Sequence, residues 1–230
     1  MGETSMVTTG QRAGSATSGS SPRVLAVLSS LLQRMVTEND KHAVEQEVEA
    51  SSSTSPASRT AIVEKLTVFH GQKAPSISVE QYVERIFIYA NCSPSCFVVA
   101  YAYLDRIVHQ QRGIPITSLN VHRLLITSVM IAAKFLDDSY YNNAYYGKVG
   151  GVSTQEMNRL ELEFLFRLGF RLHITLDVFD SYCSHLEREL ASYDVVAALP
   201  PTPEEADRRR VVKQPPSSYQ QITHILESVS

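Results

Sequence analysis

The most apolar stretch of the chain runs from Leu124 to Leu136 and presents hydrophobic or small side chains on every face of a helix. That pattern predicts a helix enclosed by its neighbours, because a surface helix would keep one polar face. A single lysine, Lys134, interrupts the pattern. A buried ammonium group is costly unless it is paired or reaches water. Lys134 is therefore expected to extend into solvent, to pair with Asp138 one turn later, or to meet a partner.

Other segments with a 3.6-residue apolar period flank this helix along the chain. Gly113, Pro115 and Gly169 follow two of them, as expected where helices end. Ser153 and Glu156 have the spacing of a capping box. The segments expected to be helical are 79–92, 95–110, about 119–136 and 157–168, with a short helix before Gly150. No segment alternates convincingly as a strand, so the predicted fold class is all-α.

Composition divides the chain into four parts. Residues 1–21 are rich in Ser, Thr and Gly and are expected to be disordered. Residues 22–58 are expected to hold an N-terminal helix, over about 23–36, and then a polar linker. The main helical domain is assigned to residues 59–192 and ends in a helix that starts near residue 176. Residues 193–230, with a Pro-rich and charged run, are expected to form a flexible tail.

Charge and cysteine usage exclude several classes of protein. The 230 residues carry a net charge of −3, and residues 59–189 hold 13 Lys or Arg against 13 Asp or Glu. This balance argues against nucleic-acid binding, which needs a basic face. Three cysteines without an apolar leader favour reduced thiols in the nucleus or cytoplasm. The chain has no run of about 18 apolar residues, so no membrane span is expected.

The sequence carries none of the common catalytic motifs. It has no glycine-rich phosphate loop, no His-Glu-x-x-His pair and no Gly-x-Ser-x-Gly elbow. Cys92 and Cys96 are four residues apart, but the further ligands that a zinc site needs are missing. The chain is therefore expected not to be an enzyme, to need no cofactor or metal, and to take no small-molecule substrate.

Three motifs, in this order, resemble the cyclins. They are YAYLDRI from Tyr101 to Ile107, AAKFLDD from Ala132 to Asp138, and NRLELEFLFRLGFRL from Asn158 to Leu172. The stretch SVEQYVERIFIYANC, which begins at Ser78, is similar to the plant P-type (also called U-type) cyclins and the related yeast phosphate-starvation cyclin. The resemblance covers about residues 60–190. It implies a single five-helix cyclin box, here with an extra N-terminal helix and flexible tails.

The resemblance also implies a function and a binding site. The chain is expected to be a regulatory subunit that binds and activates a cyclin-dependent serine/threonine kinase, in cell division or phosphate signalling. In cyclins the matching lysine and glutamate grip the regulatory helix of the kinase, which assigns this role to Lys134 and Glu161. The apolar contacts to that helix would fall on Ile131, Phe135, Leu165 and Phe170. Truncating either charged residue is expected to cost about 2–5 kcal/mol of binding and to barely disturb the fold.

For some residues, a purely structural role competes with a role in binding. Asp105 is expected to pair with Arg85, because a buried carboxylate without a partner is expensive. Glu161 has no cation one turn away, so it is either a solvated position or a binding residue. Along the segment 157–170 the side chains expected to face inward are Leu160, Phe164 and Leu168.

Two rival functions share the same predicted fold. A transcription-factor-like adaptor would use the five helices to bind DNA, which the balanced charge disfavours. A scaffold would bind a non-kinase partner through the same groove. The docking segment of cell-cycle cyclins is replaced here by QYVERIFIYA, and the chain has no Trp, so substrate docking by that route does not transfer.

Overall fold

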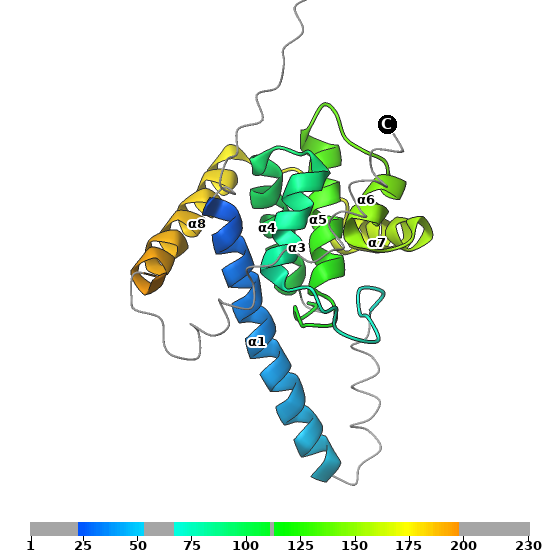
Figure 1. The fold of residues 1–230 in the computed structure, drawn as a ribbon, viewed down its shortest axis with the longest axis vertical. Coiled ribbons are helices and arrows are strands. Elements are labelled where there is room, and N and C mark those ends of the chain that lie inside the picture. Colours follow the sequence, from blue (N-terminus) through cyan, green and yellow to red (C-terminus); the bar gives the residue numbers. More distant parts are fainter. Residues whose placement is uncertain (1–22, 53–66, 111–112, 198–230) are drawn as a thin grey trace, which may run out of the picture.

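The computed structural model describes residues 23–52, 67–110 and 113–197, which form seven α-helices and no β-strand. This confirms the all-α class predicted from the sequence. The helices, shown in Figure 1, are α1 (Arg23–Ser52), α3 (Val79–Ala90), α4 (Pro94–Val108), α5 (Val121–Leu136), α6 (Asn143–Gly150), α7 (Thr154–Arg167) and α8 (Leu176–Ala197). No helix within the described residues is long and apolar enough to cross a membrane.

Helix α5 lies at the centre of the domain, in contact with α3, α4, α6 and α7 (Figure 1). Every residue from Leu124 to Ala133 is buried, which confirms the enclosed helix that the apolar pattern predicts. The hydroxyls of Thr127 and Ser128 lie in this dry region and donate to backbone carbonyls of the same helix at 2.6 and 2.9 Å. No polar group of these two side chains is therefore left unpaired by burial.

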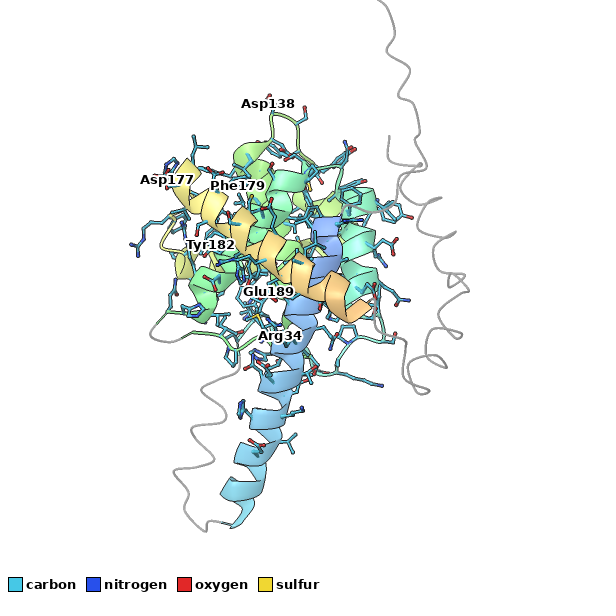
Figure 2. The ribbon with its side chains drawn as sticks, turned by 90° about the vertical axis from the view of Figure 1, so that its left-hand side faces the viewer. Arg34, Asp138, Asp177, Phe179, Tyr182 and Glu189 are labelled. Carbon is cyan, nitrogen blue, oxygen red and sulfur yellow. The ribbon has the colours of Figure 1, made fainter. Side chains whose placement is uncertain are left out.

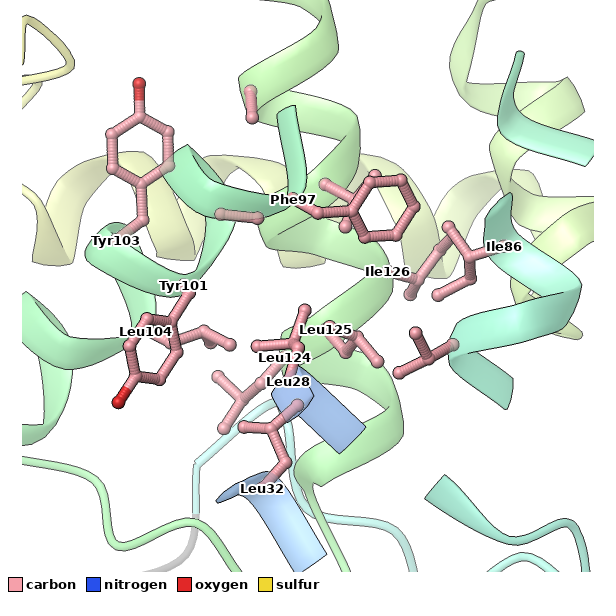
Figure 3. Close-up of a cluster of buried hydrophobic side chains, with 14 of the residues drawn as sticks. Leu28, Leu32, Ile86, Phe97, Tyr101, Tyr103, Leu104, Leu124, Leu125 and Ile126 are labelled. Carbon is pink, nitrogen blue, oxygen red and sulfur yellow. The ribbon is translucent and has the colours of Figure 1, made fainter. Parts of the chain in front are cut away.

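The core mixes side chains from helices that are distant in sequence. Figure 3 shows Leu28 and Leu32 of α1, Ile86 of α3, Phe97 and Leu104 of α4, and Leu124, Leu125 and Ile126 of α5. Each fully buried side chain of this kind contributes about 1.5–3 kcal/mol relative to its exposed state. From α7 the core receives Leu160 and Phe164, and Leu168 follows at the end of that helix, all three buried as predicted.

Helix caps follow the sequence signals, with one change of partner. Ser78 and Gln81 form a complete capping box at the start of α3. At the start of α7 the Ser153 hydroxyl accepts from the backbone N–H of Glu156 at 3.1 Å. The Glu156 carboxylate does not return to Ser153, as a full capping box would require. It pairs instead with Arg123 of α5 at 2.6 Å, so an ion pair between helices replaces the second half of the box.

Helix α1 continues well past the predicted end near residue 36. The polar stretch expected to be a linker extends the helix to Ser52, and Figure 1 shows this half projecting away from the other helices. The sequence from 37 to 52 has no Gly or Pro and is rich in Glu and Ala, so nothing in it stops the helix. The first half of α1 packs on α3 and α8, and Arg34 pairs with Glu189 of α8 at 3.3 Å (Figure 2).

The predictions for residues 1–21 and for most of the C-terminal tail fall outside the described residues. The boundary placed at residue 59 also falls outside them. Helix α8 continues to Ala197, beyond the boundary placed at residue 192.

Candidate functional site

Lys134 and Glu161 meet at the junction of α5 and α7. The Lys134 ammonium donates to Oε1 of Glu161 at 2.7 Å, and the two side chains are 25% and 22% exposed. Neither the local pairing with Asp138 nor a purely solvated Glu161 describes the structure. The lysine that interrupts the apolar helix is paired with a carboxylate 27 residues away, and both groups retain some access to solvent.

Asn143, the first residue of α6, contacts both charged groups. Its Oδ1 accepts a hydrogen bond from the Lys134 ammonium, and its Nδ2 donates to Oε2 of Glu161 at 2.6 Å. Nδ2 also donates to Oδ1 of Asn158 on α7, at 2.7 Å. The cation, the anion and the amide thus close a ring that joins α5, α6 and α7. No sequence signal used above identifies Asn143, because its partners lie on other helices.

Large exposed apolar side chains follow Lys134 and Glu161 along the chain. Phe135 and Leu136 follow Lys134 at the end of α5, and Leu162, Phe166 and Phe170 follow Glu161 along α7 and its terminal turn. The rings of Phe166 and Phe170 pack edge to face, with centroids 5.3 Å apart. We call Lys134, Glu161 and these five apolar residues the α5–α7 face. Exposed aromatic and aliphatic side chains on elements that also carry polar groups are typical of a protein-binding surface.

The end of α7 places Phe170 on this surface. Gly169 and Phe170 both have positive φ angles, 59° and 57°. The backbone N–H of Phe170 donates to Leu165 and that of Gly169 to Phe166, which is the Schellman arrangement of hydrogen bonds. Glycine tolerates this conformation, but for a bulky residue it is strained. A strained, 57% exposed Phe is the kind of outlier that marks functional sites.

The structure separates the six residues predicted to bind a kinase. Lys134, Glu161, Phe135 and Phe170 are at least partly accessible, and Leu165 is half-buried against the core. Ile131 is 2% exposed and belongs to the core, so in this conformation its side chain offers almost no surface to a partner, and its direct contact stays a prediction.

Leu162 and Phe166 are not among the binding residues predicted from the sequence, although the helical period indicates that they face away from the core. On α7, Leu160 and Phe164 lie one turn apart and face the core. Two residues further on, Leu162 and Phe166 therefore lie on the opposite side of the helix, and they are 53% and 62% exposed. Apolar residues on the side of a helix facing away from the core mark a surface that awaits a partner.

The predicted ion pair between Arg85 and Asp105 is not formed. Arg85 donates to the carbonyl oxygens of Val149 (2.8 Å) and Lys148 (3.2 Å), in the last turn of α6. A cation at this end of a helix is favoured because its last carbonyls lack partners and carry partial negative charge.

Asp105 has other partners, just after α4 and on α8. It accepts from the Tyr182 hydroxyl at 2.8 Å and lies 3.1 Å from His109. Burial, followed by this hydrogen bond to Asp105, raises the pKa of the Tyr182 phenol well above its ordinary value. The Tyr182 hydroxyl therefore stays protonated and able to donate, and the contact joins α8 to α4.

Cys96, at the start of α4, contacts the polar side chains of Ser93 and Asp137. Cys96 is buried, and its thiol donates to the Asp137 carboxylate at 3.4 Å. Cys92, Cys96 and Cys183 are free thiols. The described residues contain no group of three or more side chains placed to hold a metal ion.

Comparison with known proteins gives consistent relatives. The Cyclin family model matches residues 22–172, a range that includes α1. Cyclin-U4-1 of Arabidopsis thaliana is 56% identical over 168 residues, covering 73% of this chain and 76% of that protein. Cyclin-U1-1 of the same plant is 47% identical over 185 residues, covering 80% and 82%. Cyclin-P4-1 of Oryza sativa subsp. japonica is 48% identical over 169 residues, covering 74% of each.

Proposed function

Because the chain belongs to the cyclin family, whose members are regulatory subunits rather than enzymes, we propose that it binds and activates a cyclin-dependent serine/threonine kinase. The observation that carries this proposal is the α5–α7 face, where the same two helices carry the Lys134–Glu161 pair and large exposed apolar side chains. The kinase would cover this face with its regulatory helix and the loop beside it.

The chemistry of the face fits the end of a helix or an irregular loop in a partner. An ammonium offers three donors, and Lys134 uses two of them on Glu161 and Asn143. Its third donor fits a partner carbonyl, while the remaining lone pairs of Glu161 fit a backbone N–H. Charge-assisted hydrogen bonds of this kind are stronger than neutral ones. The exposed Phe and Leu side chains would supply apolar burial around them.

Activation would follow from binding alone, since the chain would perform no chemistry itself. The regulatory helix of such a kinase would have two positions, only one of which allows phosphoryl transfer. A partner that binds the kinase more tightly in this position shifts its population towards the active state. The biological output we propose is cell-division control or phosphate signalling, exerted in the nucleus or the cytoplasm.

The test is capture of cyclin-dependent kinases by the full chain and by two paired variants, each checked for its melting temperature. The first variant, Lys134→Ala/Glu161→Ala, removes the ion pair of the α5–α7 face. The control, Arg34→Ala/Glu189→Ala, removes an ion pair between α1 and α8. We expect the first variant, still folded, to lose kinase capture and activation, and the control to keep both.

Other results would redirect the proposal. Capture that survives in a folded Lys134→Ala/Glu161→Ala variant would place the partner on another face. A stable complex with a kinase that remains inactive would replace activation with a scaffolding role.

A further inference from the structure

Asn143 is the one neutral member of the polar ring between α5, α6 and α7. Its carbonyl oxygen faces the Lys134 cation, and its amide nitrogen faces the Glu161 anion at 2.6 Å. The second hydrogen of the same nitrogen is directed to Asn158 at 2.7 Å. Both donors and one lone pair of the Asn143 amide are therefore used, on Glu161, Asn158 and Lys134.

An amide suits this place for a chemical reason. It presents an acceptor to a cation and a donor to an anion at the same time, which neither a carboxylate nor a hydrocarbon can do. Its contacts direct one N–H of Lys134 and one oxygen of Glu161 inward. The groups left for a partner are the third N–H of Lys134 and the unused lone pairs of Glu161.

We propose that Asn143 is a positioning residue for the binding site, one that fixes which donor of Lys134 and which lone pairs of Glu161 face the kinase. This inference rests on the proposed function, because it concerns the same face. A lysine has a long side chain with many rotamers, and ordering it at the moment of binding would weaken the complex. Asn143 holds that side chain in place before the partner arrives.

This restraint matters because Lys134 has an alternative carboxylate partner nearby in the chain. Asp138 follows Lys134 by four residues and lies in the exposed loop that begins where α5 ends at Leu136 (Figure 2). Without the Asn143 oxygen, the Lys134 ammonium becomes free to divide its time between Glu161 and this carboxylate. Part of the population would then present the wrong geometry to a partner.

Three single variants of the full chain separate positioning from folding. Asn143→Ala removes both contacts of the amide to the charged pair. Asn143→Asp keeps an oxygen for Lys134 but loses the donor to Glu161, and a negative charge in the first turn of α6 favours the helix, so the variant should fold. Asn158→Ala is the matched control, because it removes a neighbour of Asn143 and leaves the ring of three intact.

Two measurements are made on each variant. The first is the kinetics of binding to the kinase captured by the wild type. We expect Asn143→Ala and Asn143→Asp to raise Kd about tenfold, mostly through faster dissociation, because a well-placed charged contact acts on the lifetime of a complex. The second is hydrogen exchange of the Lys134 ammonium by NMR without kinase. We expect Asn143→Ala to speed this exchange. Asn143→Asp, which keeps an acceptor oxygen for Lys134, and Asn158→Ala should leave it near the wild-type rate.

The outcomes distinguish this inference from the proposed function. If both Asn143 variants bind like the wild type while Lys134→Ala/Glu161→Ala does not, the positioning role is overturned and the kinase site stands. If weaker binding by Asn143→Ala accompanies a lower melting temperature and unchanged ammonium exchange, Asn143 is structural only and the inference fails. If the folded Lys134→Ala/Glu161→Ala variant binds like the wild type, the partner lies on another face, and the inference about Asn143 falls together with this site.

Discussion

The carboxylate of Asp137, at the end of α5, accepts hydrogen bonds from the backbone N–H of Ser93 at 3.0 Å and from its hydroxyl at 2.8 Å. Ser93 is the residue before α4, and its own side chain makes no cap there. In a capping box the backbone N–H at this position is satisfied from within the same helix. Here a residue 44 positions away in the chain does so, and it ties the start of α4 to the end of α5.

Replacing Asp137 by Ala should lower the free energy of unfolding by about 1–2 kcal/mol, the usual cost of losing a helix cap. Burial alone would raise the pKa of Asp137, but hydrogen bonds from Ser93 and Cys96 hold it below its ordinary value of 3.8. Because folding lowers the pKa of Asp137, its carboxylate stabilises the folded state at pH values above its pKa in the unfolded chain. That stabilisation is lost as the pH falls through its pKa in the folded state.

Urea denaturation between pH 3 and pH 7 therefore checks this prediction. The difference between the wild type and Asp137→Ala should be full near pH 7 and should shrink below about pH 4. Asp138→Ala is the neighbouring control, since that side chain is exposed and should change stability by no more than about 0.5 kcal/mol. A difference that stayed constant down to pH 3 would exclude the ionised carboxylate as its source.

The contact between Lys134 and Glu161 changes what truncation should do to the isolated fold. The sequence predicts little effect, but the structure shows a partly buried ion pair joining α5 and α7. Removing one partner leaves the other charge poorly compensated. We expect each single Ala variant to lose about 1–2 kcal/mol of stability. In a double-mutant cycle, the loss of stability of the combined variant should be smaller than the sum of the two single losses by at least about 0.5 kcal/mol.

Phe164 and Phe166 should separate folding from binding. Phe164 is fully buried and Phe166 is 62% exposed, two positions apart on the same helix. Phe164→Ala should cost about 3–5 kcal/mol of stability because it leaves a cavity. Phe166→Ala should change stability by no more than about 0.5 kcal/mol and should weaken kinase capture. Melting and capture measured on both variants check this, and unimpaired capture by Phe166→Ala would remove that ring from the interface.

Because Arg85 and Asp105 have separate partners, substitutions at these two positions should change the free energy of unfolding independently. Arg85→Ala should cost about 1–2 kcal/mol, because the last carbonyls of α6 lose a charged donor. Combining it with Asp105→Asn should be additive within about 0.5 kcal/mol. Tyr182→Phe combined with Asp105→Asn should be non-additive instead, since these two share a hydrogen bond. Coupling between Arg85 and Asp105 would restore the pair that the sequence predicts.

Local patterns in the sequence determined most of the helices and the core. Ser78, Ser153 and Gly169 mark helix boundaries because caps and stops act on backbone groups within a few residues. The inward positions of α7 follow from a period of 3.6 residues. The end of α1 was missed because a polar stretch of good helix formers reads equally well as a linker.

Only the tertiary structure decided which polar side chains meet. Arg85 reaches the end of α6 rather than Asp105, and Asn143 stands between Lys134 and Glu161. These contacts depend on how helices cross and which way each side chain points, and residues 9 to 64 positions apart carry no shared periodicity. The chain alone therefore identifies the helices and their buried sides, whereas the packing of α5, α6 and α7 decides the partners at the binding face.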